Sequence, residues 1–212
     1  VIVDHFVDLS SYLKKHGLNS LGPEDMIARK TDHRREPGYS AISLIIRDRP
    51  GLFFKIAGTL AANRINILSA WSHSIGDVAV ATFHVNDIPE GPLDDPERWN
   101  HFRENFAGVI KGDVDVHQLV AAKRQSKTVF PGGARPRFPL KVEIDNAASD
   151  RATIVEVNAH DRTGLLYDIT QCLSSLGLNI VLAKITTERD QAADIFYVQE
   201  DDGKKIVDFE RL

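Results

Sequence analysis

The chain lacks several features that mark whole classes of protein. It has one cysteine, Cys172, so no internal disulfide can form, and it has no apolar run near the roughly 20 residues that span a bilayer. Its first residues do not combine a basic region with an apolar stretch. These absences argue against a disulfide scaffold and a membrane protein, and they predict the reducing cytoplasm. Cys172 falls in a helical apolar pattern, which predicts a buried position.

An excess of basic charge is also missing. The 26 Lys and Arg residues stand against 30 Asp and Glu residues, for a net charge of -4. No positive field is available to hold a phosphate backbone, so nucleic acid is not an expected partner, and neither is a membrane. The eight histidines form no cluster with the spacing of metal ligands, and His160 sits at a predicted strand end. The sequence therefore predicts no metal site.

What the sequence does contain is an internal repeat. When the chain is shifted against itself, Asp48-Arg49-Pro50-Gly51-Leu52 aligns with Asp161-Arg162-Thr163-Gly164-Leu165 without a gap. Matches then continue in the same register: Ile56 with Ile169, Leu60 with Leu173, Asn66 with Asn179, Ile67 with Ile180, Ala70 with Ala183, Phe83 with Phe196 and Val85 with Val198. Matches spread over this length indicate two copies of one structural unit.

The first copy predicts the order of a ferredoxin-like unit, β-α-β-β-α-β. Its helix begins near Pro50, and Asn63 is expected to end it in a left-handed conformation. The second helix begins at Pro96 and places three aromatic residues on a core face. Those residues are Trp99, Phe102 and Phe106. The predicted strands are residues 41–46, 65–73, 78–85 and 113–119.

The second copy predicts the first four of these elements. They are a strand at 153–159, a helix at 164–176 stopped by Gly177, and two strands around 188–190. Residues 203–212 resemble a turn and the start of a further helix, so this unit is expected to be incomplete. The alternating segment 140–145 is a candidate for the missing sheet edge.

The domain organisation follows from the repeat. We expect a helical tail or linker from a preceding domain at residues 1–37, a first unit at 38–124, a linker at 125–138 and an incomplete second unit at 139–212. The sequence begins at Val1 without an initiator Met, which predicts a piece of a longer protein.

The motifs at the repeated positions resemble those of the ACT domain, a small amino-acid-binding regulatory module. The resemblance lies in a first strand that runs into Asp-Arg-x-Gly-Leu and in Asn-Ile at the start of the second strand, and both copies fit it. The stretch from Val142 to Val198 is similar to the last ACT domain of the bifunctional PII uridylyltransferase/uridylyl-removing enzymes. The first copy differs in having Ala81 where the second has Asp194, and Ser72-His73-Ser74 in place of Thr186-Thr187.

The resemblance implies an α+β fold of two ferredoxin-like ACT domains in tandem. It implies a regulatory region that senses L-glutamine and controls nitrogen-assimilation signalling. The upstream catalytic domains would be a nucleotidyltransferase and a phosphohydrolase that use Mg and UTP and act on the PII protein, whereas this fragment would hold no cofactor and catalyse nothing. Two alternatives stay open: a free-standing ACT-repeat protein that binds an amino acid, and a ferredoxin-like association module without a ligand.

The candidate ligand site lies at the two Asp-Arg-x-Gly loops. Free N-H groups at the helix starts near Gly51 or Gly164 attract a carboxylate, while Asp48 or Asp161 pairs with an ammonium group. Asn66 or Asn179 suits a glutamine amide. The full set is Asp48, Arg49, Gly51, Leu52, Asn66, Ile67, Asp161, Arg162, Gly164, Leu165, Asn179 and Ile180. The alternatives are that Asp caps the helix, that Gly relieves a tight corner, and that Asn tolerates a left-handed turn.

A single ferredoxin-like unit leaves strand edges exposed, and symmetric association is the common way to cover them. We therefore expect a homodimer, or two copies that pack sheet to sheet or edge to edge, with the ligand where two units meet.

The sequence has neither a phosphate-cradling loop nor a metal cluster, so we expect residues 1–212 alone to have no nucleotidyl-transfer or hydrolytic activity. The measurement is uridylylation of purified PII protein by the isolated chain. Transfer above the rate without added chain would contradict the expectation.

Overall fold

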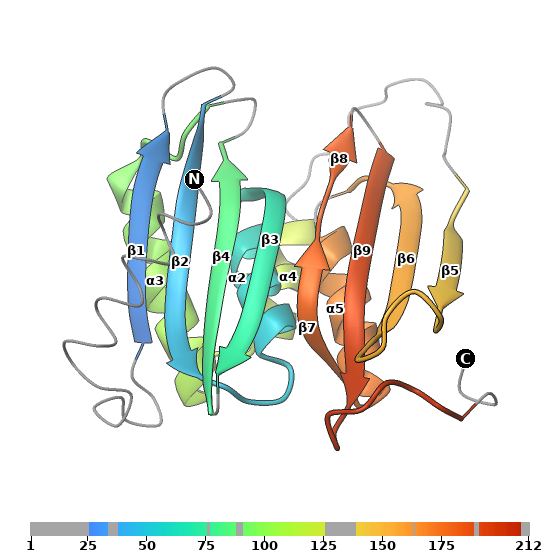
Figure 1. Ribbon diagram of the computed structural model, residues 1–212. Coiled ribbons are helices and arrows are strands. Elements are labelled where there is room, and N and C mark those ends of the chain that lie inside the picture. The colour runs from blue at the N-terminus through green and yellow to red at the C-terminus, as the bar shows by residue number, and fades with distance from the viewer. Residues whose placement is uncertain are drawn as a thin grey trace.

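Two antiparallel sheets stand side by side in the computed structural model, and the helices cover one common face of both (Figure 1). The structure describes residues 26–33, 38–75, 77–87, 91–125, 139–162, 164–188 and 191–208. Each sheet belongs to one copy of the repeat, which confirms the predicted α+β fold with two units in tandem.

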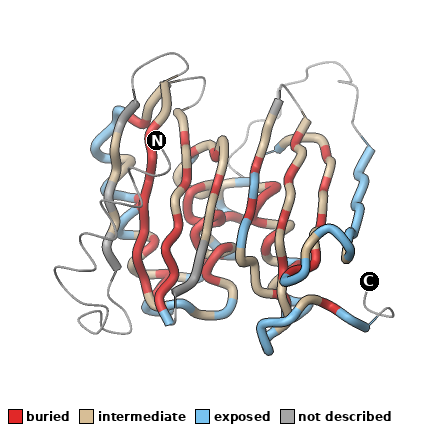
Figure 2. Tube along the Cα trace, in the orientation of Figure 1, coloured by how far each residue is buried: buried red, intermediate tan, exposed pale blue. Residues whose placement is uncertain are grey.

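The first unit has a four-stranded sheet in the order β1-β2-β4-β3. Its elements are β1 (Met26–His33), β2 (Tyr39–Arg47), α2 (Leu52–Ala62), β3 (Asn66–Ile75), β4 (Val78–Asn86), α3 (Pro96–Lys111) and α4 (Val116–Gln125). Strand β2 is buried along nearly its whole length, which accounts for its continuous run of apolar and small residues (Figure 2).

The second unit repeats the first strand for strand. Its elements are β5 (Lys141–Asp145), β6 (Thr153–His160), α5 (Leu165–Ser175), β7 (Leu178–Lys184), β8 (Thr187–Glu188) and β9 (Gln191–Glu200). The sheet order is β5-β6-β9-β7, with β8 beside β9. Equivalent residues pair across equivalent strands, since Ile42 faces Phe83 and Val155 faces Phe196. The pairing of β3 with β4 changes register after Ile67, and the pairing of β7 with β9 changes register after Ile180, which is the equivalent residue of the second unit.

The fourth strand of each sheet comes from the segment that precedes the unit. For the second unit this confirms the expectation for residues 140–145, because β5 pairs with β6. For the first unit the predicted strand at 113–119 is wrong, and β1 pairs with β2 instead. The first unit therefore includes residues 26–33, which were expected to belong to a helical tail, and extends before residue 38.

Residues 116–125 form helix α4 because their apolar pattern is helical. Val116 and Val120 are buried four residues apart, and the carboxylate of Asp115 accepts a hydrogen bond from the His117 N-H at the helix start. The alternation of Val114 and Val116 is also typical of a strand, but this pattern is too short to distinguish a strand from a helix.

The helix ends follow from short polar and glycine signals. Asp95 caps α3, since its side chain accepts from the N-H groups of Glu97 and Arg98, and Gly112 ends this helix with φ of 85°. Gly177 stops α5 as predicted, with φ of 72°. At the end of α2 the prediction for Asn63 is wrong: Asn63 has φ of -91°, and Arg64 takes the left-handed conformation.

Two further expectations are wrong. Cys172 is exposed, because α5 buries a stripe that includes Leu166, Thr170 and Leu173 and Cys172 lies outside it. The turn at Gly203 forms, but residues 204–208 do not continue as a helix. Instead Ile206 is buried, and its N-H donates to the Thr153 hydroxyl at 2.9 Å.

One apolar core runs through both units, and α2 lies at its centre. Helix α2 contacts α3, α4 and α5, and the edge strands β3 and β7 lie next to each other without a shared ladder. The core includes Phe83, Phe102 and Phe106 of the first unit and Phe196 of the second. This confirms the core role predicted for the aromatic face of α3. The two copies thus pack edge to edge within one chain, while a homodimer stays a prediction.

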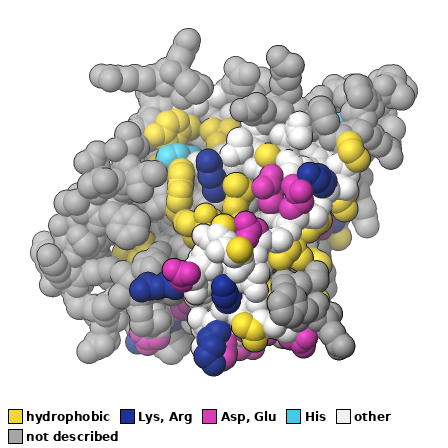
Figure 3. All heavy atoms as spheres, turned by 45° about the vertical axis from the view of Figure 1, so that its right-hand side comes forward, with side chains coloured by type: hydrophobic (Ala, Val, Ile, Leu, Met, Phe, Trp, Pro, Cys, Tyr) yellow, Lys and Arg dark blue, Asp and Glu magenta, His cyan; other side chains and the backbone are white. Residues whose placement is uncertain are grey.

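The surface has mixed charge. On the side of the second unit turned forward in Figure 3, basic and acidic side chains lie among each other rather than in separate fields. Within the described ranges, none of the helices combines the length and apolar character that crossing a membrane requires.

The contact between α2 and α5 leaves no room for a side chain at Gly58. A Cβ there would lie 2.6 Å from the ring of Tyr167 and 2.6 Å from Val116. We expect Gly58→Leu to separate α2 from α5 and α4 and to lower the free energy of unfolding by about 1–3 kcal/mol, measured by urea denaturation. Ala122→Leu, at an exposed position of α4, is the control and should leave stability nearly unchanged. Equal stability of both variants and the parent would contradict this close packing.

Candidate functional site

Two pockets lie where the units meet, and each contains one of the repeated loops. The first, here called the Asp161 pocket, has a volume of about 150 Å³. This is below the roughly 300–1,000 Å³ of sites for drug-sized ligands, so it suits a molecule of amino-acid size. It is lined by Ala57, Ala61, Arg64, Ile65, Asn66 and Ile67 of the first unit and by Asp161, Arg162, Gly164, Leu165, Leu166, Tyr167, Ile185, Thr187, Ala192 and Asp194 of the second.

The second, the Asp48 pocket, is wider, with a volume of about 510 Å³. Its walls come from the loop between β2 and α2, from the start of β7, and from the residues that end β9 and follow it. Asp48, Arg49, Gly51 and Leu52 line one side, and Asn179, Ile180 and Asp201 line the other.

The tertiary structure exchanges the predicted partners between the two copies. Because each Asn begins the strand after the helix of its own unit, it was expected beside the Asp-Arg-x-Gly loop of that same unit. Instead Asn66 lines the pocket of the Asp161 loop, and Asn179 lines the pocket of the Asp48 loop. The twelve candidate residues divide evenly. Asn66, Ile67, Asp161, Arg162, Gly164 and Leu165 line the Asp161 pocket, and Asp48, Arg49, Gly51, Leu52, Asn179 and Ile180 line the Asp48 pocket.

Each pocket contains a helix start whose N-cap residue is a glycine. Gly51 and Gly164 are the N-cap residues of α2 and α5, with φ of 73° and 79°, a left-handed conformation that favours glycine, and as glycines they offer no capping side chain of their own. Among the described residues Asp161 makes no capping hydrogen bond, so its interpretation as a cap is wrong, and the tight corner at Gly is confirmed, while a cap by Asp48 stays a prediction. The first-turn N-H groups of a helix have no intrahelical acceptor, so these two ends suit an anionic group.

The arginines of the motif are held by the protein. Arg162 pairs with Asp168 at 2.5 Å, and Arg49 donates to the Ile110 carbonyl at 3.0 Å. Arg124 of α4 also pairs with Asp168, at 2.8 Å, and donates to the Gly164 carbonyl at 3.3 Å. These contacts anchor the Asp161 loop to helix α4 of the first unit. They leave the arginine head groups committed to the scaffold rather than to a ligand.

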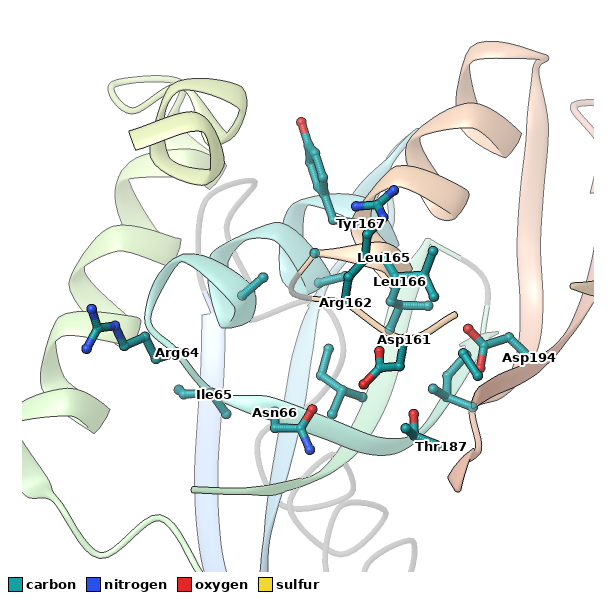
Figure 4. Close-up of a pocket in the computed structure, with 16 residues that line it drawn as sticks. Arg64, Ile65, Asn66, Asp161, Arg162, Leu165, Leu166, Tyr167, Thr187 and Asp194 are labelled. Carbon is teal, nitrogen blue, oxygen red and sulfur yellow. The ribbon is translucent and has the colours of Figure 1, made fainter. Parts of the chain in front are cut away.

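Each asparagine lines the pocket that holds the loop of the other unit, and its side chain is hydrogen-bonded at the end of the neighbouring strand of its own sheet. The amide of Asn66 donates to the Asn86 side chain at 2.9 Å, and that of Asn179 donates to Asp201 at 3.1 Å. Among the described non-glycine residues only Arg64 has a positive φ, so the left-handed interpretation of the asparagines is wrong. In Figure 4 the Asn66 amide is turned toward the Asp161 side of the pocket.

Asp194 is not one of the twelve candidate residues, although the sequence marks it as the residue that stands where the first copy has Ala81. Its carboxyl lines the Asp161 pocket from β9, and the residue is 2% exposed (Figure 4). Burial raises the pKa of Asp194 to about 7, and the charge of Asp161 acts in the same direction, while a hydrogen bond from the Thr186 N-H opposes them. The sequence does contain a sign of this position. Along β9 every second residue is buried, and an acidic residue stands at one of these buried positions, between Ala192 and Phe196.

Comparison with known protein families identifies both units. Residues 40–96 match the ACT domain model, and residues 141–212 match the model of the ACR9-like, ACT-like domain. Together with the two sheets and their helices, these matches establish a tandem of ACT-type domains.

Individual relatives place this tandem more closely. The chain is 37% identical over 84% of its length to the bifunctional uridylyltransferase/uridylyl-removing enzyme of Gluconobacter oxydans, of which it covers 19%. The enzyme of the same name from Rhodospirillum rubrum is 32% identical over 81% of this chain, and the match covers 18% of that enzyme. The enzyme of the same name from Zymomonas mobilis is 36% identical over 83% of this chain, and the match covers 19% of that enzyme. The chain thus belongs with the ACT region of this enzyme family, and it spans about a fifth of the length of these relatives.

The raised pKa of Asp194 makes the stability of the chain depend on pH. The folded protein keeps a proton that the unfolded chain has released, so stability falls as pH rises from about 4 to about 7 and then levels off. Asp194→Asn has no such proton, and above pH 7 we expect it to exceed the parent by on the order of 2–4 kcal/mol, with little difference near pH 4. Urea denaturation across this pH range measures the difference. Parallel curves for parent and variant would contradict the prediction.

Proposed function

We propose that this chain is the amino-acid-sensing regulatory region of a bifunctional uridylyltransferase/uridylyl-removing enzyme, and that its ligand is L-glutamine. The observation that carries the proposal is that each Asp-Arg-x-Gly loop meets the start of the second strand of the other unit in a pocket. A ligand in either pocket contacts both units. The relatives' names support the identity of the regulated enzyme.

The Asp161 pocket offers a complementary group for each end of a zwitterionic amino acid. The N-H groups of the first turn of α5 suit the α-carboxylate, because the N-cap residue Gly164 has no side chain to cap them; that of Leu165 is already bonded to the Arg162 carbonyl at 3.0 Å, which leaves those that follow it. The carboxylate of Asp161 suits the α-ammonium group. Asn66, across the junction, suits the side-chain amide of glutamine, since an amide group both donates and accepts hydrogen bonds. Ile67 and Leu165 provide apolar contacts for the methylene groups.

Ligand binding would bias the packing of the two units, since the ligand bridges them. The Asp161 loop is joined to α4 through Arg124, so a ligand that fixes this loop also fixes α4. Coupling free energies between sites are typically on the order of 1–3 kcal/mol, enough to bias a regulated enzyme.

In the whole protein this bias would control uridylyl transfer to the PII protein and its removal. The catalytic domains, with their Mg and UTP, would lie outside these residues, and the protein would work in the cytoplasm. The chain itself would bind the effector, and the change in its packing on binding would alter the activity of the catalytic domains. The fit of the relatives over about four fifths of this chain supports that assignment.

Substitution of Gly164 tests the proposal. We expect L-glutamine to bind the chain in isothermal titration calorimetry, and Gly164→Val to weaken binding at the Asp161 pocket at least about tenfold, or 1.4 kcal/mol. A side chain there blocks backbone approach, and its Cβ would lie 2.9 Å from the Arg124 guanidinium. Gly51→Val is the corresponding variant for the Asp48 pocket.

The matched control is Gly177→Val. Gly177 has nearly the same φ, 72°, but a Cβ there would meet nothing within 4 Å, so this variant carries the backbone strain without touching a pocket. Arg151→Ala, at the surface, is a second control. If glutamine gave no heat and no thermal shift with the parent, the chain would be an association module instead of a sensor.

A further inference from the structure

Asp194 occupies a position that the repeat otherwise gives to an apolar residue. On β9, alternate residues from Ala192 to Val198 point to the helix-covered side and are buried, and Asp194 is one of them. The equivalent residue of the first unit is Ala81, which is also buried. The fold therefore needs no carboxyl at this position. Because an ionised carboxylate is costly to bury without a partner, the acid at 194 calls for a functional explanation.

The protein itself does little to compensate this carboxyl. The hydrogen bond from the Thr186 N-H, at 3.3 Å, is its one polar contact in the described part of the chain. Arg162 is paired with Asp168, and the guanidinium of Arg64 points away from Asp194 in Figure 4. No cation of the described residues forms an ion pair with Asp194.

A second carboxyl lines the same small pocket. Asp161 lies on the loop after β6, and Asp194 lies on the neighbouring strand β9, so two acidic groups border a space of about 150 Å³ (Figure 4). A ligand cation placed between them would offset both the cost of burial and the repulsion between the two groups. The Asp48 pocket is also lined by acidic residues, Asp77, Glu200 and Asp201, but none of them is buried, and Ala81 stands at the position equivalent to Asp194.

We propose that Asp194 makes the Asp161 pocket selective for ligands with a cationic amino group, which binds between the carboxylates of Asp161 and Asp194, and that this binding releases a proton. The inference rests on the proposed function and deepens it, because it makes the two pockets unequal. The Asp161 pocket binds its ligand with an affinity that depends on pH, and the Asp48 pocket does not.

The proton comes from Asp194. Burial and the charge of Asp161 raise its pKa to about 7, so near neutral pH the empty pocket holds a mixture of protonated and ionised forms. The ammonium group selects the ionised form, and the proton passes to the buffer. Affinity therefore falls as pH drops below about 7.

The other charged and titratable groups near Asp194 come from several elements. They are Asp161 and Arg162 on the loop after β6, Tyr167 on α5, Arg64 after α2 and the exposed Lys184 on β7. His160 is the last residue of β6 and pairs with Gln191. Val157 pairs with Asp194, and the side chains of His160 and Val157 point to opposite faces of the sheet. All of these groups are retained in an Asp194→Asn variant, so a comparison with that variant isolates the carboxyl.

The test is calorimetric titration of the 212-residue chain with L-glutamine at pH 6 and pH 7.5, in two buffers of different ionisation enthalpy. We expect affinity at the Asp161 pocket to fall on the order of tenfold from pH 7.5 to pH 6, with about one proton released per bound ligand at pH 6 and clearly less than one at pH 7.5. Asp194→Asn should weaken binding at pH 7.5, remove the pH dependence and release no proton. Glu156→Gln, in the opposite phase of β6, is the matched control and should behave as the parent.

A second probe addresses the amino group. Glutaramate, which is glutamine without its α-amino group, should bind the parent at least about tenfold more weakly than glutamine, and Asp194→Asn should lose most of this discrimination. Asp194→Ala, which copies the residue of the first unit, should behave as Asp194→Asn does. Thermal unfolding of each variant verifies that it is folded at the temperature of the titration.

The outcomes separate the two proposals. Glutamine binding with no proton release, equal at both pH values and unaffected by Asp194→Asn, would overturn the role of Asp194 and leave the glutamine sensor intact. Absence of glutamine binding at either pH would overturn the proposed function. The role of Asp194 would then stand only if another standard amino acid binds with a proton release that Asp194→Asn abolishes. Magnesium chloride alone causing the same proton release would also overturn it.

Discussion

The packing of α2 against α5 is the contact on which the other features of this structure depend. It is close because Gly58 lies directly against the ring of Tyr167. It brings the edge strands β3 and β7 next to each other and merges the two apolar cores into one. With the two units edge to edge at β3 and β7, the loop of each lies beside the second strand of the other. Neither pocket would exist in an isolated unit.

The same contact makes the junction suitable for regulation. Asn66 is part of the first unit but lines the pocket that contains the Asp161 loop of the second. A ligand in this pocket therefore contacts both units, and its affinity depends on how the two units are placed relative to each other. The Asp161 loop is further tied to α4 through Arg124 and Asp168, and α4 has no counterpart among the described elements of the second unit. The repeat is therefore symmetric in its sheets and asymmetric in what surrounds the pockets.

Sequence reasoning succeeded where local chemistry decides the structure. The repeated Asp-Arg-x-Gly-Leu motif marked two strand-to-helix corners, and Gly51 and Gly164 adopt the left-handed conformation expected of such corners. It failed where a short pattern fits two structures. Val114 and Val116 fit a strand, and Val116 and Val120 fit a helix, but only the position of β1 beside β2 shows that the sheet edge is already filled.

The sequence by itself determined the two-unit α+β architecture, the register of the repeat and twelve of the residues that line the two pockets. These features depend on periodicity, glycine conformation and identities along the chain, all of which are local. Only the tertiary structure decided which residues meet, because Asn66 and Asp161 are far apart in sequence and approach through the packing of the units. It alone also revealed the burial of Asp194, since the cost of an ionised carboxyl depends on what surrounds it in space and not on its neighbours in the chain.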